Sequence, residues 1–161
     1  MIRVGVLTVS TSGARGERVD ASGDIVKEMV AGIGGQIEAY SIVPDEREQI
    51  AALLRDWSDR QGLDLIVTTG GTGLSPTDVT PEATRDVLDK ELPGLGETMR
   101  QVSIAKAPRA MLSRATAGAR GHTLIVNLPG SPRGVRECLE AILAVLPHAV
   151  EILQDRPTDH R

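Results

Sequence analysis

A glycine-rich loop directly after an apolar segment constrains this chain more than any other feature. Residues 63–69, LDLIVTT, are mostly apolar or β-branched, which is typical of a buried parallel strand. Gly70, Gly71 and Gly73 follow at once, and the hydroxyl of Thr72 lies between them. Because such a loop has few side chains, its backbone N–H groups can approach an anionic ligand closely. The pattern predicts a ligand-binding loop at the end of a strand in an α/β sheet.

A helix is expected soon after this loop. Thr80 is suited to cap it, Pro81 to occupy its first turn, and Glu82 to lie near its positive end. The glycine spacing matches neither a Walker A loop nor the dinucleotide fingerprint. Asp78 would repel a phosphate unless a divalent cation lay between them, so loop and carboxylate together suggest a magnesium-nucleotide site. The alternative is a tight strand-to-helix connection with a solvated aspartate.

Strands and helices alternate along the rest of the chain. Strands are expected at residues 2–9, 36–43, 63–69 and 123–128. Apolar residues at helical spacing follow these strands, and such alternation favours a mostly parallel sheet with helices on both faces. We therefore expect one three-layer α/β/α domain over residues 1–154, with a frayed tail at residues 155–161.

Polar residues gather where the predicted strands end. Ser10 follows the first strand, and Asp20 and Ser22 precede the helix after it. Asp45 follows the second strand, and the loop at residues 127–131, NLPGS, follows the last. Because parallel strands end at the same edge of a sheet, these groups are expected to share a crevice with the glycine loop. Several of them are also suited to helix capping, so a cap and a ligand contact are both open for the three that precede helices.

The composition excludes several classes of protein. The chain has no Phe, a single Tyr (Tyr40), a single Trp (Trp57) and a net charge of −4, which argues against a general nucleic-acid binder. The three histidines are dispersed, so neither a Ser-His-Asp triad nor a zinc site is expected. Cys138, the only cysteine, lies among apolar residues and is expected to pack rather than react.

No targeting or membrane segment is evident in the sequence. The chain opens with the predicted strand, MIRVGVLTVS, and shows no charged region followed by an apolar signal core. No apolar segment reaches the length of a membrane span. We therefore expect a soluble cytoplasmic protein that binds neither nucleic acid nor membrane.

Several motifs resemble those of the MogA/MoaB family of molybdenum cofactor biosynthesis proteins. The run GGTGLSPTDVTPEAT from Gly70 to Thr84 resembles the family signature, and the resemblance extends over nearly the whole chain. The other matching segments are VGVLTVS at residues 4–10, DASG at 20–23, VPDE at 43–46, PGLGETMRQ at 93–101, MLSRATAG at 111–118 and NLPGSP at 127–132. The resemblance is strongest to the molybdopterin adenylyltransferase branch.

The resemblance implies a fold, an assembly and an activity. Members share a three-layer α/β fold and commonly form homotrimers, sometimes hexamers. The implied reaction transfers the AMP moiety of ATP to the terminal phosphate of molybdopterin and releases pyrophosphate. It prepares the cofactor for metal insertion, which implies a transient contact with a molybdenum-insertion protein. A magnesium ion (Mg2+) would offset the charge between the two phosphate-bearing substrates.

The resemblance also assigns roles to particular residues. Asp45 and Asp78 match the family's acidic positions and would bind magnesium and orient the reacting phosphates. The residues implied on the nucleotide side are Gly70, Gly71, Thr72, Gly73, Asn127, Pro129, Gly130 and Ser131. The residues implied around the pterin and its phosphate are Ser10, Asp20, Ser22, Ser113 and Arg114.

Other functions are also open at this point. Many relatives have Asp or Asn where this chain has Thr11, so an altered polar contact is expected there. Some MoaB-type members are regarded as accessory proteins, and the same loops would suit a non-catalytic molybdopterin-binding or scaffold protein that delivers the cofactor to a partner. A nucleotide-sensing regulator would bind AMP or ATP without requiring a pterin.

Overall fold

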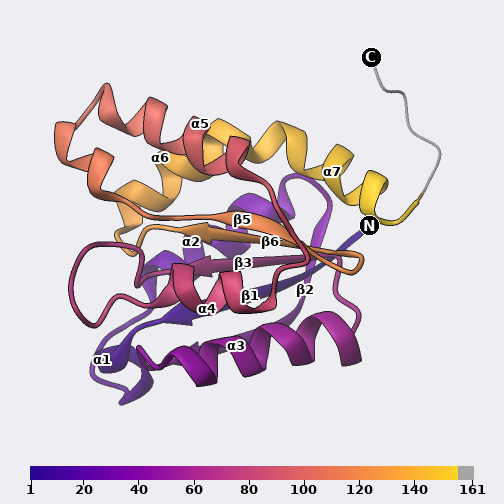
Figure 1. The fold of residues 1–161 in the computed structure, drawn as a ribbon, viewed down its shortest axis with the longest axis horizontal. Helices are drawn as coiled ribbons and strands as arrows, with labels where there is room; N and C mark the ends of the chain where they lie inside the picture. Colours follow the sequence, from indigo (N-terminus) through magenta and orange to yellow (C-terminus); the bar gives the residue numbers. More distant parts are fainter. Residues whose placement is uncertain (156–161) are drawn as a thin grey trace.

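A six-stranded mixed sheet covered by helices on both faces forms the centre of the structure (Figure 1). This computed structural model describes residues 1–155 of the 161-residue chain. The tail predicted at residues 155–161 lies outside the described part except for Asp155, which belongs to a turn. No helix within residues 1–155 is long and apolar enough to cross a bilayer.

Parallel strands form the middle of the sheet, and two antiparallel strands extend one edge. The parallel strands are β1 (Ile2–Val9), β2 (Gly35–Val43), β3 (Leu65–Thr69) and β6 (Thr123–Leu128). The antiparallel strands are β5 (Ala117–Arg120) and β4 (Lys90–Glu91), and the order is β2-β1-β3-β6-β5-β4. The mostly parallel α/β sheet expected from the sequence is confirmed. The antiparallel edge was not predicted, because β4 and β5 are too short to show a clear pattern.

The helices form two layers, one on each face of the sheet (Figure 1). One layer contains α2 (Ala21–Ala31), α5 (Pro93–Ile104), α6 (Pro132–Ile142) and α7 (Leu146–Leu153). The other contains α3 (Arg47–Arg55) and α4 (Thr80–Val87). The shorter helical elements are α1 (Thr11–Ala14), η1 (Asp56–Arg60), η2 (Pro108–Leu112) and η3 (Leu143–Val145).

The core is aliphatic on both faces, because successive strand residues point to opposite sides of the sheet. In β1, Val6 packs into the core beneath α2 and α6, whereas Leu7 packs into the core beneath α3 and α4. Trp57 fills the space that the missing side chain of Gly5 leaves, since a Cβ at that position would lie 2.7 Å from the indole ring. The core therefore closes without phenylalanine.

The chain reverses its direction across the sheet between β1 and β3. It passes from β1 through α2 to β2 on one side, then returns through α3 to β3 on the other side of β1. The loops that leave β1 and β3 therefore diverge at the carboxyl ends of these strands. An open α/β sheet binds its ligands in the crevice formed at such a point. The glycine loop begins here, directly after β3.

Candidate functional site

A cavity of about 590 Å³ opens at this crevice. Its walls come from the loops after β1, β2, β3 and β6 and from the start of α2. The predicted site residues that line it are Ser10, Asp20, Ser22, Asp45, Gly70, Gly71, Asp78, Gly130 and Ser131. Residues predicted for the nucleotide and residues predicted for the pterin therefore share one cavity.

Two glycines let the loop after β3 pass close to its neighbours. Gly70 has a φ of +100°, and a Cβ there would lie 2.2 Å from the carbonyl oxygen of Val9. Gly71 has a φ of +68°, and a Cβ there would lie 2.3 Å from Thr80 Oγ1 and 3.2 Å from Asp45 Oδ1. Both positions therefore require glycine. The N–H group of Gly71 donates to no acceptor within the described residues and is available to an anion.

Thr80 holds this loop rather than capping the helix, so the predicted cap is wrong. The N-cap position of α4 is Val79, and Thr80 is the buried first residue of the helix. Thr80 Oγ1 donates to the carbonyl oxygen of Gly70 at 2.9 Å, and the Thr80 N–H group donates to that of Gly71 at 3.1 Å. The hydroxyl thus fixes the glycine loop against the start of α4.

Asp45 does not cap its helix either. Glu46 takes the N-cap position of α3 and makes no capping hydrogen bond with its side chain. Asp45 pairs instead with Thr11, whose Oγ1 and N–H group donate to Asp45 Oδ2 at 2.8 and 3.3 Å. The Asp45 N–H group donates back to Thr11 Oγ1 at 3.1 Å. The other carboxylate oxygen, Oδ1, lies near Gly71 and accepts no hydrogen bond from residues 1–155.

Asp78 lines the cavity from the turn that follows the glycine loop. Its Oδ2 accepts a hydrogen bond from the Ser75 N–H group at 3.1 Å, while Oδ1 accepts none from the described part of the chain. Asp45 and Asp78 therefore each keep one carboxylate oxygen for a ligand. No group of three or more His, Cys, Asp or Glu residues among residues 1–155 is arranged to hold a metal by itself. Two carboxylates nevertheless suit magnesium, which proteins commonly bind with phosphate oxygens and water completing its shell.

Ser10, Asp20 and Ser22 line the cavity while also making structural hydrogen bonds. Ser10 caps α1, and Asp20 caps α2, so the capping role is confirmed for Asp20. Asp20 also accepts a hydrogen bond from the Tyr40 hydroxyl. Burial and this carboxylate raise the pKa of Tyr40 well above its usual value. Ser22 Oγ donates to the carbonyl oxygen of Gly130 at 2.7 Å and so ties the start of α2 to the loop after β6.

Four residues predicted on the nucleotide side do not line the larger cavity: Thr72, Gly73, Asn127 and Pro129. Asn127 is fully buried, and its amide donates to the hydroxyls of Thr68 and Thr84 at 3.0 Å each. Its side chain therefore supports the sheet from within and has no exposed surface with which to contact a nucleotide. Thr72 is also buried, and Thr72 and Gly73 both lie outside the lining.

A second cavity of about 290 Å³ shares Ser131 with the first. Ser113 and Pro129 line this second cavity rather than the larger one. Its basic lining residues are Arg100, Lys106, Arg109 and Arg133, against the single acidic residue Glu137. Met99 and Cys138 add apolar surface, and burial raises the pKa of the Cys138 thiol, in agreement with packing rather than reactivity.

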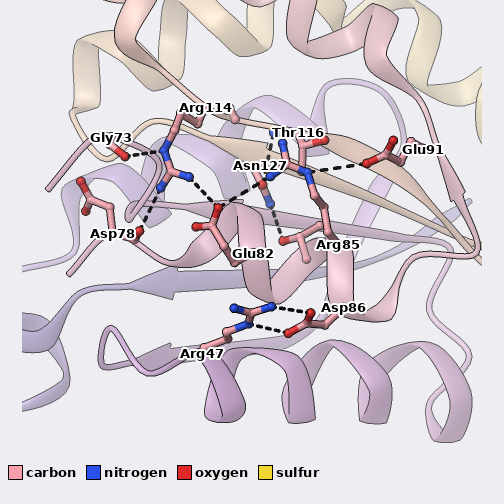
Figure 2. Close-up of polar contacts among 12 residues, drawn as sticks. Arg47, Gly73, Asp78, Glu82, Arg85, Asp86, Glu91, Arg114, Thr116 and Asn127 are labelled. Carbon is pink, nitrogen blue, oxygen red and sulfur yellow. Dashed lines mark hydrogen bonds and ion pairs between the residues drawn. The ribbon is translucent and has the colours of Figure 1, made fainter. Parts of the chain in front are cut away.

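Arg114, predicted near the pterin and its phosphate, is engaged with protein groups (Figure 2). Its guanidinium donates to the carbonyl oxygens of Gly73 and Asp78 at 2.8 and 2.9 Å, and to Glu82 Oε2 at 2.6 Å. The hydrogen bond from Arg114 holds the pKa of Glu82 below its usual range, and the same bond raises the pKa of Arg114. Arg114 lines neither of the two cavities described above, but it lines a third, of about 320 Å³, together with Arg85 and Arg100.

Reasoning from the sequence missed the groups that hold the site residues in place. Thr11 stood out only as a departure from relatives, and Thr80 only as a cap. The basic residues of the second cavity form no local pattern, because they come from α5, η2, α6 and the segment between α5 and η2. Only the folded chain brings these groups together.

The fold and the larger cavity define a class of protein: an α/β domain whose switch point combines a glycine loop with two carboxylates, suited to a phosphate-bearing ligand. The sequence supports a narrower statement. Residues 5–148 match the family described as a probable molybdopterin binding domain, and this match covers most of the chain. The chain belongs to that family.

Individual relatives agree with this assignment. The crystal structure of the molybdopterin biosynthesis enzyme MoaB from Thermus thermophilus is 57% identical, with a TM-score of 0.92, over 99% of this chain and 100% of its own. The molybdopterin adenylyltransferase of Helicobacter pylori strain J99 is 44% identical over 94% of this chain and 88% of its own length. The molybdenum cofactor synthesis protein cinnamon of Drosophila melanogaster is 45% identical over 96% of this chain, which spans only 26% of that protein.

The first prediction concerns the pairing of Thr11 with Asp45. Thr11→Val keeps the shape of the side chain but removes the hydroxyl, so the free energy of unfolding should fall by about 1–2 kcal/mol. Thr11→Ser retains the hydroxyl and should stay close to wild type. Chemical denaturation measures both variants, and equal stability of Thr11→Val and wild type would contradict the role assigned to the pair.

Proposed function

We propose that this chain is a molybdopterin adenylyltransferase. The observation that carries the proposal is that Asp45 and Asp78 each keep a free carboxylate oxygen in one cavity with the glycine loop. The Helicobacter pylori relative that carries this name matches nearly the whole chain. A second, mainly basic cavity adjoins the first and suits an anionic second substrate.

The proposed reaction joins two phosphates. An oxygen of the terminal phosphate of molybdopterin attacks the α-phosphorus of ATP and forms a new P–O bond. The bond from the α-phosphorus to the bridging oxygen breaks, and pyrophosphate leaves with the bonding electrons. Because both substrates are anionic, the transfer is favoured by groups that offset charge and hold the phosphates in line.

Backbone groups and a helix end support binding of the nucleotide. Gly71, Gly130 and Ser131 line the cavity, and α6 begins directly after Ser131, so its positive end lies at this loop. Asp45 and Asp78 would hold a magnesium ion together with phosphate oxygens. When bound, magnesium would offset part of the negative charge that collects where the substrates meet.

Molybdopterin is proposed to reach the site from the second cavity. The basic side chains of that cavity suit its phosphate, and Ser131 joins the two cavities. Ser113 belongs to this proposed molybdopterin side. Ser10, Asp20 and Ser22 are proposed as walls of the larger cavity that both substrates reach.

Two further proposals concern the setting of the reaction. We propose that residues 1–154 act as one domain, since the family match covers residues 5–148. We also propose a cytoplasmic location, where ATP is available, and a transient contact with a molybdenum-insertion protein that takes up the product.

The chain is proposed to form a homotrimer, or a hexamer built from trimers. Apolar side chains on α5, η2 and the residue before α5 are at least one-third exposed: Leu92, Val102, Ile104, Met111 and Leu112. Such a surface is suited to packing between subunits. Light scattering at micromolar concentration should give the trimer mass, and a monomer at every concentration would contradict this assembly.

The catalytic role is tested by pyrophosphate release from ATP, magnesium and molybdopterin. Wild type should release pyrophosphate, and Asp78→Asn should lower the rate by about a hundredfold or more, equivalent to a lost transition-state contact of about 3 kcal/mol. Molybdopterin affinity and the thermal midpoint should stay near wild type, because Asn still accepts the hydrogen bond from Ser75. Asp45→Asn should behave in the same way.

Three outcomes would point elsewhere. Near-normal turnover of Asp78→Asn at saturating ATP and magnesium would contradict a catalytic role for Asp78. A wild type that binds molybdopterin but releases no pyrophosphate above background would favour a scaffold that delivers the cofactor. Binding of AMP or ATP that is indifferent to molybdopterin would favour a nucleotide sensor.

A further inference from the structure

Arg114 lies outside the larger cavity but is bonded to the segment that carries Asp78. We propose that Arg114 is a positioning residue that fixes Asp78 in the cavity, in place of the pterin contact that the family resemblance implies. The catalytic consequence of this role rests on the proposed function. The attachment of residues 72–78 to Arg114 is a property of the fold and can be measured without turnover.

Arg114 contacts both ends of the segment at residues 72–78. At the first end, its N–H group donates to Thr72 O at 2.8 Å, and its Nε donates to Gly73 O at 2.8 Å. At the other end, its Nη2 donates to Asp78 O at 2.9 Å. Arg114 therefore ties the two ends of the segment to each other (Figure 2), in addition to the hydrogen bonds from Thr80 to the preceding Gly70 and Gly71.

The middle of the segment has no comparable anchor. Residues 74–77 are exposed, and their hydrogen bonds within the described part of the chain stay inside the segment. The Ser75 N–H group donates to Asp78 Oδ2, and the Asp78 N–H group donates to Ser75 O at 2.9 Å. These bonds shape a turn without attaching it to the sheet. The direction of the Asp78 carboxylate therefore depends on the anchor that Arg114 supplies.

Glu82 fixes the guanidinium from the first turn of α4. Its Oε2 accepts a hydrogen bond from Arg114 Nη1 at 2.6 Å, and both side chains are less than one-third exposed. The guanidinium thus directs three N–H groups to three protein oxygens, a planar arrangement that the point charge of lysine cannot reproduce. A substrate phosphate at Arg114 would have to compete with Glu82 for the same charge.

The matched variants are Arg114→Lys and Arg47→Lys. Arg47, on α3, forms an ion pair with Asp86, which lies on α4 as Glu82 does, through two hydrogen bonds of 2.7 Å each (Figure 2). Arg47→Lys therefore controls for the loss of an ion pair to α4. Hydrogen exchange at the hydrogen-bonded amides of Ser75 and Asp78 should be at least about tenfold faster in Arg114→Lys and unchanged in Arg47→Lys. The kcat of Arg114→Lys should fall by about a hundredfold, as expected for a displaced catalytic group. Its Kd for molybdopterin should stay within about twofold of wild type, since Arg114 positions Asp78 and does not contact the substrate.

A weaker molybdopterin Kd with unchanged exchange at the Ser75 and Asp78 amides would overturn the proposal and restore the direct pterin contact. Exchange and Kd do not depend on turnover. If wild type released no pyrophosphate, faster exchange with an unchanged Kd would still support the attachment, while the adenylyltransferase function would fail. The two claims are therefore separable.

Glu82→Gln keeps the test decisive if Arg114→Lys does not fold. It preserves the size of the side chain but removes the charge that holds the guanidinium, so exchange at the Ser75 and Asp78 amides should again accelerate. Because the folded state lowers the pKa of Glu82, its stabilisation is present above the pKa of the unfolded chain and is lost as the pH falls through the folded value. The thermal midpoints of wild type and Glu82→Gln should differ at pH 7 and converge in acid. Unchanged exchange together with equal midpoints at pH 7 would count against the anchor.

Discussion

The site depends on the close passage of the loop after β3 across the end of β1. Gly70 makes this contact possible, because a Cβ at its position would lie 2.2 Å from the carbonyl oxygen of Val9. The N–H group of the same residue donates to the carbonyl oxygen of Leu128, at the end of β6, at 3.1 Å. Gly70, directly after β3, therefore lies in contact with the ends of both β1 and β6. The glycine loop and both carboxylates lie in one cavity because these strand ends meet.

The charges around this contact are distributed unevenly. Asp45 and Asp78 are each held through one oxygen, by Thr11 and Ser75, and each leaves the other oxygen free. The larger cavity also includes Asp20 against a single basic residue, Arg18, whereas the charged lining of the second cavity is mainly basic. An acidic cavity that shares a loop with a basic one suits a reaction in which a metal-bound phosphate meets a second phosphate. The fold thus places acidic residues in the larger cavity and basic residues in the second one, rather than pairing them with each other.

Much of the fold was predictable from the sequence, because hydrophobic periodicity and the alternation of strands and helices are local signals. Which loops meet also followed, since parallel strands end at the same edge. The roles of Thr80 and Arg114 did not follow, because a hydroxyl or guanidinium near a helix gives no sign of the distant carbonyl to which it donates. The burial of the Asn127 side chain did not follow for the same reason: its amide donates to one hydroxyl on β3 and another on α4.

The Asp45 and Asp78 carboxylates are proposed to hold a metal ion against the phosphates of a nucleotide. Crystals grown with manganese in place of magnesium and a non-hydrolysable ATP analogue test this proposal most directly, because the anomalous signal of manganese locates the metal itself. We expect one metal bound by the Asp45 and Asp78 carboxylates and by oxygens of the analogue, beside Gly71. A nucleotide bound in the cavity with no metal at either carboxylate, or a metal bound elsewhere, would contradict it.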